Sequence, residues 1–177
     1  METLDIVPVP RHEAARLAAL ETATFVETFA HLNDPAELDD HVARAFAVDR
    51  IAAQLQDERV ELSWVLDGGD PVAFLKLNHG DAQTELGLAD GLEVEQVYVA
   101  ATHQGRGVGR LLLQHAMERA TEAGLAFVWL GVWEHNTKGI AVYERVGFRT
   151  FGEHTFLLGT DPQRDVLMRL ELPYEAT

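Results

Sequence analysis

The most informative pattern of apolar and polar residues runs from Gly91 to Phe148. Residues 91–100 alternate between apolar and polar, as a half-buried strand does. Across residues 108–123 the apolar positions recur at steps of three and four, which places them on one face of a helix. A short continuous apolar run at 126–132 is typical of a buried strand, and a second helical pattern fills 136–147. The order predicted is strand, glycine turn, helix, strand and helix.

Three residues are expected to set the ends of these helices. Asn136 can cap the second helix with its side chain, and Gly124 and Gly147 can end the two helices in a left-handed conformation. Simple alternation in the first strand also predicts its two faces. One face would carry Leu92, Val94, Gln96 and Tyr98, and the other Glu93, Glu95, Val97 and Val99.

The N-terminal part of the chain predicts an edge strand at Leu4–Val9 and a series of helices. The first helix is expected from Arg11 to about Ala30, with an interruption at Glu21–Thr24, where threonines cluster. Asp34-Pro35 should open a second helix with proline at its first position, and Asp49 should cap a third. These helices are where the substrate pocket is expected.

The remaining segments predict strands. Val60–Leu66 and Pro71–Leu77 should pair through the turn Asp67-Gly68-Gly69-Asp70, with Trp64 and Phe74 in the core. The connection 79–90 has a looser pattern, with a short edge strand near Thr84–Leu86. After Phe148, strands at Arg149–His154 and Asp165–Leu172 should close the sheet as a hairpin.

Composition limits the classes of function. Residues 1–177 are expected to form one domain, and the chain has no cysteine, which excludes thiolate chemistry and disulfides. The formal net charge of −15 disfavours nucleic acid and anionic membranes, and either attracts small cations or serves solubility. No apolar run approaches 20 residues, the N-terminus lacks a secretory pattern, and the eight histidines show no metal-ligand spacing. A cytoplasmic enzyme without a metal is expected.

The glycine turn Gln104–Arg110 carries the first chemical signal. No side chains cover the backbone at Gly105, Gly107 and Gly109, where a helix begins. The N-terminus of a helix offers unpaired N–H groups and the positive end of the helix dipole. Such a turn suits a pyrophosphate, with Arg106 and Arg110 adding charge at its rim. The alternative is a tight turn with no ligand. The spacing fits neither a Walker loop nor the dinucleotide fingerprint.

Two motifs together resemble the GCN5-related N-acetyltransferases. Gln104-x-x-Gly107-x-Gly109 lies between a strand and a helix, and Asn136 precedes Tyr143 by seven residues within a helical segment. The resemblance implies a single-domain α/β (α+β) fold. Its central mixed, mostly antiparallel sheet would have about seven strands, splayed between strands 4 and 5 and flanked by helices.

The resemblance also implies acetyl-CoA as co-substrate and a role for each matching residue. The pantetheine arm and acetyl carbonyl would meet the backbone of Val97, Tyr98 and Val99. The pyrophosphate would meet Gln104, Gly105, Arg106, Gly107, Val108, Gly109 and Arg110. Asn136 would bind the arm and Tyr143 would protonate the leaving thiolate, and seven residues place both on one helix face. The alternative for Tyr143 is a core aromatic.

Two residues are candidates for the base that takes the proton of the amine. Family members often use a glutamate on the strand before the turn, and Glu93 and Glu95 both lie there. Either could act directly or through water, bind a cation, or face solvent.

A narrower resemblance, to the PaiA-type branch, extends over most of the chain. It is carried by residues 24–33, 129–136 and 151–159, with Gln163 and Asp165 following. The type member acetylates spermidine and spermine, so a small primary amine is the expected acceptor, reached by direct transfer in a ternary complex. A protein or peptide acetyltransferase and a non-catalytic acyl-CoA-binding regulator are the alternatives. His31 and His154 are expected either to line the acceptor site or to be polar surface, and the family leaves a homodimer open.

Overall fold

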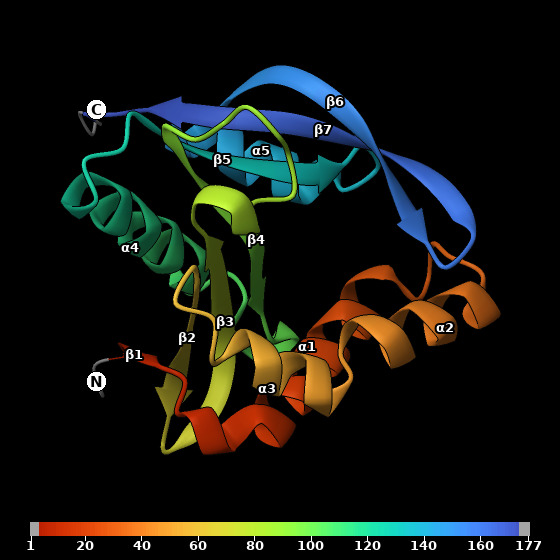
Figure 1. The fold of residues 1–177 in the computed structure, drawn as a ribbon. Coiled ribbons are helices and arrows are strands. Elements are labelled where there is room, and N and C mark those ends of the chain that lie inside the picture. Colours follow the sequence, from red (N-terminus) through yellow and green to blue (C-terminus); the bar gives the residue numbers. More distant parts are fainter. Residues whose placement is uncertain (1–3, 174–177) are drawn as a thin grey trace.

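Seven strands form one sheet within residues 4–173, the part of the chain that the computed structural model describes (Figure 1). Their spatial order is β1-β2-β3-β4-β5-β7-β6. Only the β4–β5 pair is parallel, and all other neighbouring pairs are antiparallel. The strands are β1 Asp5–Pro8, β2 Val60–Asp67, β3 Asp70–Asn78, β4 Gly91–Val99, β5 Phe127–Trp133, β6 Arg149–Leu158 and β7 Asp161–Glu171.

Five α-helices flank this sheet, which confirms the predicted fold class. Figure 1 shows α1, α2 and α3 grouped together, with α2 near the tip of the β6–β7 hairpin, while α4 lies apart from them and packs on β3, β4 and β5. None of the helices between residues 4 and 173 has the length and apolar character needed to cross a membrane. The helices are α1 Ala14–Phe29, α2 Pro35–Ala45, α3 Val48–Gln54, α4 Val108–Glu122 and α5 Thr137–Val146.

The sheet opens between its two parallel strands. The β4–β5 ladder holds only three pairs, Gly91 with Phe127, Leu92 with Val128 and Glu93 with Trp129. Beyond them β4 continues to Val99 and β5 to Trp133, without pairing to each other. Backbone groups on these facing edges therefore lack the partners that a sheet normally supplies, and a bound molecule can take their place.

Two apolar clusters hold the helices to opposite faces of the sheet. One joins the sheet to α4 and includes Leu75 and Leu112, both almost fully buried. The other joins it to α1–α3 and includes Trp64 and Phe74, exposed by only 2% and 0%. Adjacent β3 residues belong to different clusters because side chains alternate across a strand. Core positions for Trp64 and Phe74 are thus confirmed.

Local signals for turns and caps are reproduced in the structure. Asp34 accepts backbone N–H bonds from Ala36 and Glu37 at the start of α2. Asn136 caps α5 by accepting from Gly139 N at 3.0 Å. Gly147 ends α5 in a left-handed conformation with φ of 119°. Each of these features depends on residues a few positions apart, which explains why the sequence predicts them.

The predicted interruption of the first helix is wrong, because α1 runs unbroken from Ala14 to Phe29. Thr24 donates its hydroxyl to the carbonyls of Leu20 and Glu21, and Thr28 donates to Thr24 in the same way. These threonines bond within the helix instead of competing with it.

Three further boundaries differ from expectation. Asp49 lies in the first turn of α3, which begins at Val48. Its charge interacts favourably with the helix dipole, but its side chain does not cap the helix. Residues 84–86 form no strand, because the Thr84 N–H donates to a carboxylate of Glu93 and not to a sheet ladder. The last two strands extend toward each other and leave only Gly159-Thr160 between them, with Gly159 at a φ of 60°.

Candidate active site

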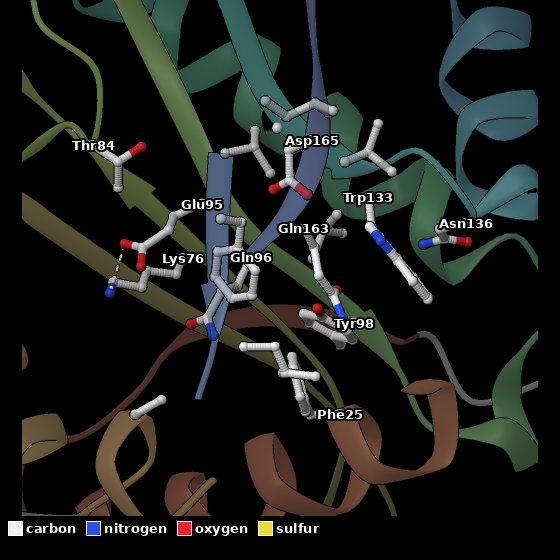
Figure 2. A pocket seen from close by; sticks show the side chains of 18 of the residues that line it. Phe25, Lys76, Thr84, Glu95, Gln96, Tyr98, Trp133, Asn136, Gln163 and Asp165 are labelled. Atoms are coloured by element: carbon white, nitrogen blue, oxygen red, sulfur yellow. Dashed lines mark ion pairs between the residues drawn. The ribbon is translucent and has the colours of Figure 1, made fainter. Parts of the chain in front are cut away.

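A cavity of about 570 Å³ opens between the helices α1–α3 and the splayed part of the sheet (Figure 2). It extends from Arg50 and Gln54 on α3, past β4, to Asn136 and Tyr143 at α5. One continuous space therefore joins Val97, Tyr98 and Asn136, which are among the residues expected to bind the acetyl donor, with the early helices.

A β-bulge in β4 decides which side chains enter this cavity. Lys76 of β3 pairs with Gln96 and the next residue, Leu77, pairs with Val94, so Glu95 is an extra residue on β4. The bulge reverses the alternation that the sequence predicted. Val97 and Val99 pack with Leu92 and Val94 against the α4 cluster, whereas Tyr98 joins the cluster on the other face. Figure 2 shows Glu95, Gln96 and Tyr98 at the cavity.

Glu93 and Glu95 are both at the cavity but are held differently. Glu93 is 2% exposed and accepts from Thr84 N, Thr84 Oγ1 and Asn78 Nδ2, which engages both of its oxygens. Burial raises its pKa, and the bonds from Thr84 and Asn78 oppose that rise. Glu95 accepts through Oε2 alone, from Asn78 and from Lys76 Nζ, both at 2.6 Å. Glu95 thus keeps Oε1 available.

Asn136 and Tyr143 reach the cavity from the last helix. The Asn136 Oδ1 is used in capping, which leaves its Nδ2 to donate. Gly139 is required here, because a Cβ on it would lie 2.8 Å from that Nδ2. Burial raises the pKa of Tyr143 to about 12, so the phenol keeps its proton at neutral pH. A protonated phenol at this position can act as an acid.

Tyr98 stands among the charged groups of the site. Its pKa is raised mainly by burial, and the nearby Tyr143, Asp165, Glu21 and Glu95 add to the rise. Its ring stacks on Phe74 at 5.6 Å between centroids. The phenol of Tyr98 is therefore neutral and fixed.

The glycine turn lies outside the cavity, at the start of α4. Gly105 and Gly107 have φ of 74° and 84°, a region that other residues enter at a cost, and no side chain caps the helix. Gln104 Nε2 donates to Val99 O at 3.0 Å and so ties the turn to the end of β4. The N-terminal N–H groups of α4 are left for an anion.

Aromatic rings from α1, β4 and β5 form one wall of the cavity. Phe25 and Phe29 are 4.6 Å apart between centroids, and Phe29 meets Trp133 edge-on at 5.9 Å. His41 stacks on Phe25 at 5.0 Å, and burial lowers the pKa of its ring, so it is uncharged at neutral pH. The rings of this wall therefore pack against one another and present a mostly apolar surface.

The opposite wall carries a histidine held between two carboxylates, an arrangement that the sequence did not predict. His154 Nε2 lies 3.3 Å from Asp165 Oδ2, and its Nδ1 meets Glu85 Oε1. The hydrogen bond to Asp165 raises the pKa of His154 to about 9, against the opposing effect of burial. The ring is therefore a cation at neutral pH. The second oxygen of Asp165 is buried without a hydrogen-bond partner.

Glu21 on α1 was also not predicted as a site residue. It lines the cavity, is 2% exposed, and its Oε1 is buried without a hydrogen-bond partner. Burial raises its pKa to about 7, although Lys76 and Arg50 nearby lower it. The sequence gave no signal beyond a glutamate on the inner face of a helix.

The tip of the β6–β7 hairpin closes one side of the cavity. Gln163 Nε2 donates to Asn33 Oδ1 at 2.7 Å, and Thr160 Oγ1 donates to Glu37 Oε1 at 2.7 Å. These contacts join the end of the chain to the α1–α2 region and enclose the space beneath.

The structure therefore groups the predicted residues into two sets. Those lining the cavity are Glu93, Glu95, Val97, Tyr98, Asn136 and Tyr143. Val99 and the turn residues Gln104, Gly105, Arg106, Gly107, Val108, Gly109 and Arg110 lie together beyond its rim. Of the two candidate histidines, His154 lines the cavity and His31 is exposed elsewhere. Residues 4–173 contain no cluster of three or more potential metal ligands.

Two features define an acetyltransferase-type α/β protein. The sheet opens between its two parallel strands, and the adjacent helix begins at a glycine turn without a side-chain cap. The chain matches the acetyltransferase (GNAT) family over residues 15–148 and belongs to that family. It is an acetyl-CoA-dependent N-acetyltransferase of the GNAT type. It is 31% identical over 172 residues to an uncharacterized N-acetyltransferase in the pepI 3′ region of Lactobacillus delbrueckii subsp. lactis, covering 97% of this chain and 99% of that relative.

Solved structures share this fold over nearly the whole chain. The PaiA N-acetyltransferase from Thermoplasma acidophilum, in complex with coenzyme A, aligns with a TM-score of 0.80 at 14% identity, covering 96% of this chain and 99% of that one. The putative acetyltransferase yncA from Salmonella typhimurium, with acetyl-CoA, aligns with a TM-score of 0.73 at 20% identity, covering 99% and 98%.

Proposed function

We propose that the protein transfers the acetyl group of acetyl-CoA directly to a primary amine of a small polyamine-like acceptor. The observation that carries this proposal is the continuity between the opening in the sheet and a cavity lined by acidic side chains. Five carboxyl side chains line the cavity, together with the basic side chains of Arg50 and Lys76 and the cationic ring of His154. Such a lining favours a cationic acceptor.

The donor half of the site fits acetyl-CoA by the chemistry of its groups. Free N–H groups at the start of α4, with Arg106 and Arg110 exposed beside them, suit a pyrophosphate. The unpaired edge of β4 from Val97 to Val99 suits the amide groups of a pantetheine arm. Structures of the two fold relatives described above were obtained with coenzyme A or acetyl-CoA, which supports the same co-substrate here.

The proposed transfer needs only the residues at the cavity. The amine nitrogen attacks the thioester carbonyl carbon, a C–N bond forms and the C–S bond breaks. Backbone N–H groups of Val97–Val99 stabilise the negative charge that develops on the carbonyl oxygen. The proton lost by the amine passes to Glu95 or Glu93, directly or through water, and the Tyr143 hydroxyl proton passes to the departing sulfur. A route through an acetyl-cysteine is excluded because the chain has no cysteine.

A small acceptor is favoured over a folded protein or a long peptide by the β6–β7 hairpin, which covers one side of the cavity. The bonds from Thr160 to Glu37 and from Gln163 to Asn33 hold the β6–β7 hairpin onto the α1–α2 region. A peptide would need an open groove in that place. The retained Tyr143 and Asn136 also favour an enzyme over a regulator that only binds acyl-CoA.

The test is the release of free thiol from acetyl-CoA, measured with spermidine, spermine, amino acids, aminoglycosides and short peptides as acceptors. Turnover with the polyamines is expected, together with an acetylated product seen by mass spectrometry. Turnover confined to peptides would overturn the small-amine acceptor. Binding of acetyl-CoA without transfer to any amine would overturn the catalytic proposal.

A further inference from the structure

Glu21 is a buried carboxyl group without a hydrogen-bond partner for one of its oxygens in the described part of the chain. Its side chain lies on α1 facing the cavity, with only 2% of the residue exposed, and its Oε1 is buried with no hydrogen-bond partner. Leaving a buried carboxylate oxygen unpaired costs free energy, because the lost contact with water is not replaced. A site that keeps such a group without a partner in the protein is suited to one from a ligand.

The neighbouring charges do not supply that partner. Lys76, which faces Glu21 from β3, is held by Glu95 at 2.6 Å and is itself 5% exposed. Arg50, on α3, is exposed to solvent and interacts with Glu21 through charge alone. Glu95 is the third charged neighbour and repels the Glu21 carboxylate. The Lys76–Glu95 pair is neutral together, and Arg50 offsets the charge of Glu21 without bonding to its free oxygen.

The face of α1 continues from Glu21 toward the splayed strands as an apolar track. Phe25 and Phe29 follow Glu21 at intervals of four residues, which places all three side chains on one side of the helix. All three line the cavity, and Phe29 reaches the ring of Trp133 on β5. Glu21 also adds to the raised pKa of Tyr98, which shows that its charge reaches the middle of the site. Figure 2 shows Phe25, Tyr98 and Trp133 along this wall.

We propose that Glu21 anchors a second ammonium group of the acceptor, so that the enzyme selects amines with two cationic nitrogens joined by a methylene chain. This inference rests on the proposed function. One nitrogen lies at the opening of the sheet and is acetylated, the methylene groups lie on Phe25 and Phe29, and the other nitrogen donates to the free oxygen of Glu21. Glu21 is a specificity residue that does not contact the reacting atoms.

The pH dependence of selection follows from the ionisation of Glu21, whose pKa is raised by burial to about 7. Only the carboxylate attracts a cation, so the preference for a diamine strengthens as pH rises through 7. The other charged groups facing Glu21 are Lys76, Arg50 and Glu95. The ratio of kcat/KM for a diamine to that for a monoamine of the same length isolates this effect from ionisation of the reacting amine.

Glu21 and Phe29 are eight residues apart, about 12 Å along the helix, so the diamine must be long enough to span them. The experiment compares 1,8-diaminooctane with 1-aminooctane in the wild-type enzyme and in Glu21→Gln. Wild type is expected to favour the diamine, mostly through KM, and Glu21→Gln to lose about 10- to 100-fold of that preference, as befits one charge-assisted hydrogen bond. The variant should keep its kcat/KM for the monoamine within about twofold, and its diamine preference should no longer change between pH 6 and 8. Glu58→Gln, an exposed matched change outside the cavity, should behave as wild type.

A further variant, Arg50→Gln, tests whether Glu21 serves this arginine instead of a ligand. If Glu21 binds the second ammonium group, removing Arg50, which competes for the same carboxylate, should leave the preference for the diamine unchanged or stronger. A loss that matches Glu21→Gln would overturn the inference. So would equal losses for the two amines in Glu21→Gln, or a wild-type enzyme that uses 1-aminooctane as well as the diamine. In that last case the proposed acetyl transfer would still stand, whereas absence of turnover with every amine would overturn the proposed function itself.

The melting temperature of Glu21→Gln provides a control for folding. A neutral amide in place of an unpaired carboxylate should leave the variant as stable as wild type or more stable. A marked fall in melting temperature would show that Glu21 is needed by the fold and would overturn its role as a ligand group.

Discussion

Lys76 and Glu95 form an ion pair from neighbouring strands, with 2.6 Å between Nζ and Oε2 (Figure 2). The lysine side chain is 6% exposed and the glutamate 27% exposed, so the pair lies at the boundary of the cavity. Asn78 binds the same Glu95 oxygen from the other side. Glu95 is therefore held in a fixed place by one oxygen, whereas both oxygens of Glu93 are already bonded.

This difference favours Glu95 as the base. In Glu95→Gln, kcat/KM should fall by about 10²- to 10⁴-fold, and the limb of the pH profile that rises with pH should disappear. Glu93→Gln should keep that limb and lose stability instead, because it disturbs the bonds from Thr84 and Asn78. Full pH–rate profiles of the two variants, with thermal melts, separate the roles. The reverse pattern would assign the base to Glu93.

The proposed acid predicts a loss of chemistry without a loss of binding. Tyr143→Phe removes a hydroxyl and keeps the ring contact with Phe148, whose centroid lies 6.0 Å away. The value of kcat should fall by about 10²- to 10⁴-fold. Affinity for acetyl-CoA, measured by calorimetry, should change by less than about threefold. Near-normal turnover in Tyr143→Phe would show that Tyr143 contributes only packing and is not the acid.

The glycine turn predicts a change in donor affinity with a closely matched control. Gly107→Ala forces a left-handed residue at the start of α4, where φ is 84°, and should cost about 1–2 kcal/mol of stability. Because the turn would relax away from this shape, acetyl-CoA should bind more weakly. Gly124→Ala meets a similar strain at φ of 69°, just past the C-terminal end of α4 and away from the glycine turn. It should lower stability and leave donor affinity unchanged, and equal affinities in the two variants would contradict the assignment of the turn.

The charged histidine predicts how stability depends on pH. The pKa of His154 is about 9 in the folded protein, against 6.5 for an ordinary histidine, because Asp165 and Glu85 bind the protonated ring. Its contribution to stability is therefore complete below about pH 6.5 and is lost as pH rises to about 9. Wild type should lose stability across this window relative to His154→Gln. Denaturant melts at several pH values test this, and parallel curves for the two proteins would show that the ring is not held as a cation.

The local parts of this protein were predictable because each depends on neighbours in the chain. The caps at Asp34 and Asn136, the ends at Gly124 and Gly147, and the hairpin turn at 67–70 involve residues within four or five positions of each other. The motif residues of the glycine turn and of α5 were found in the same way. Their spacing also led to the correct family and fold.

What only the tertiary structure decided are the features that depend on pairing between distant segments. The bulge at Glu95 arises from the register of β4 against β3, and it exchanges the faces that alternation assigned to Tyr98 and its neighbours. The pKa of His154 is raised by hydrogen bonds to Asp165 and to Glu85, which is 69 residues away in the chain. The isolation of Glu21 exists only because α1 packs against the open sheet. The periodicity of the sequence does not reveal such contacts. The free energies of burial and of ion pairing depend on which groups lie across the cavity, and not on the next residue along the chain.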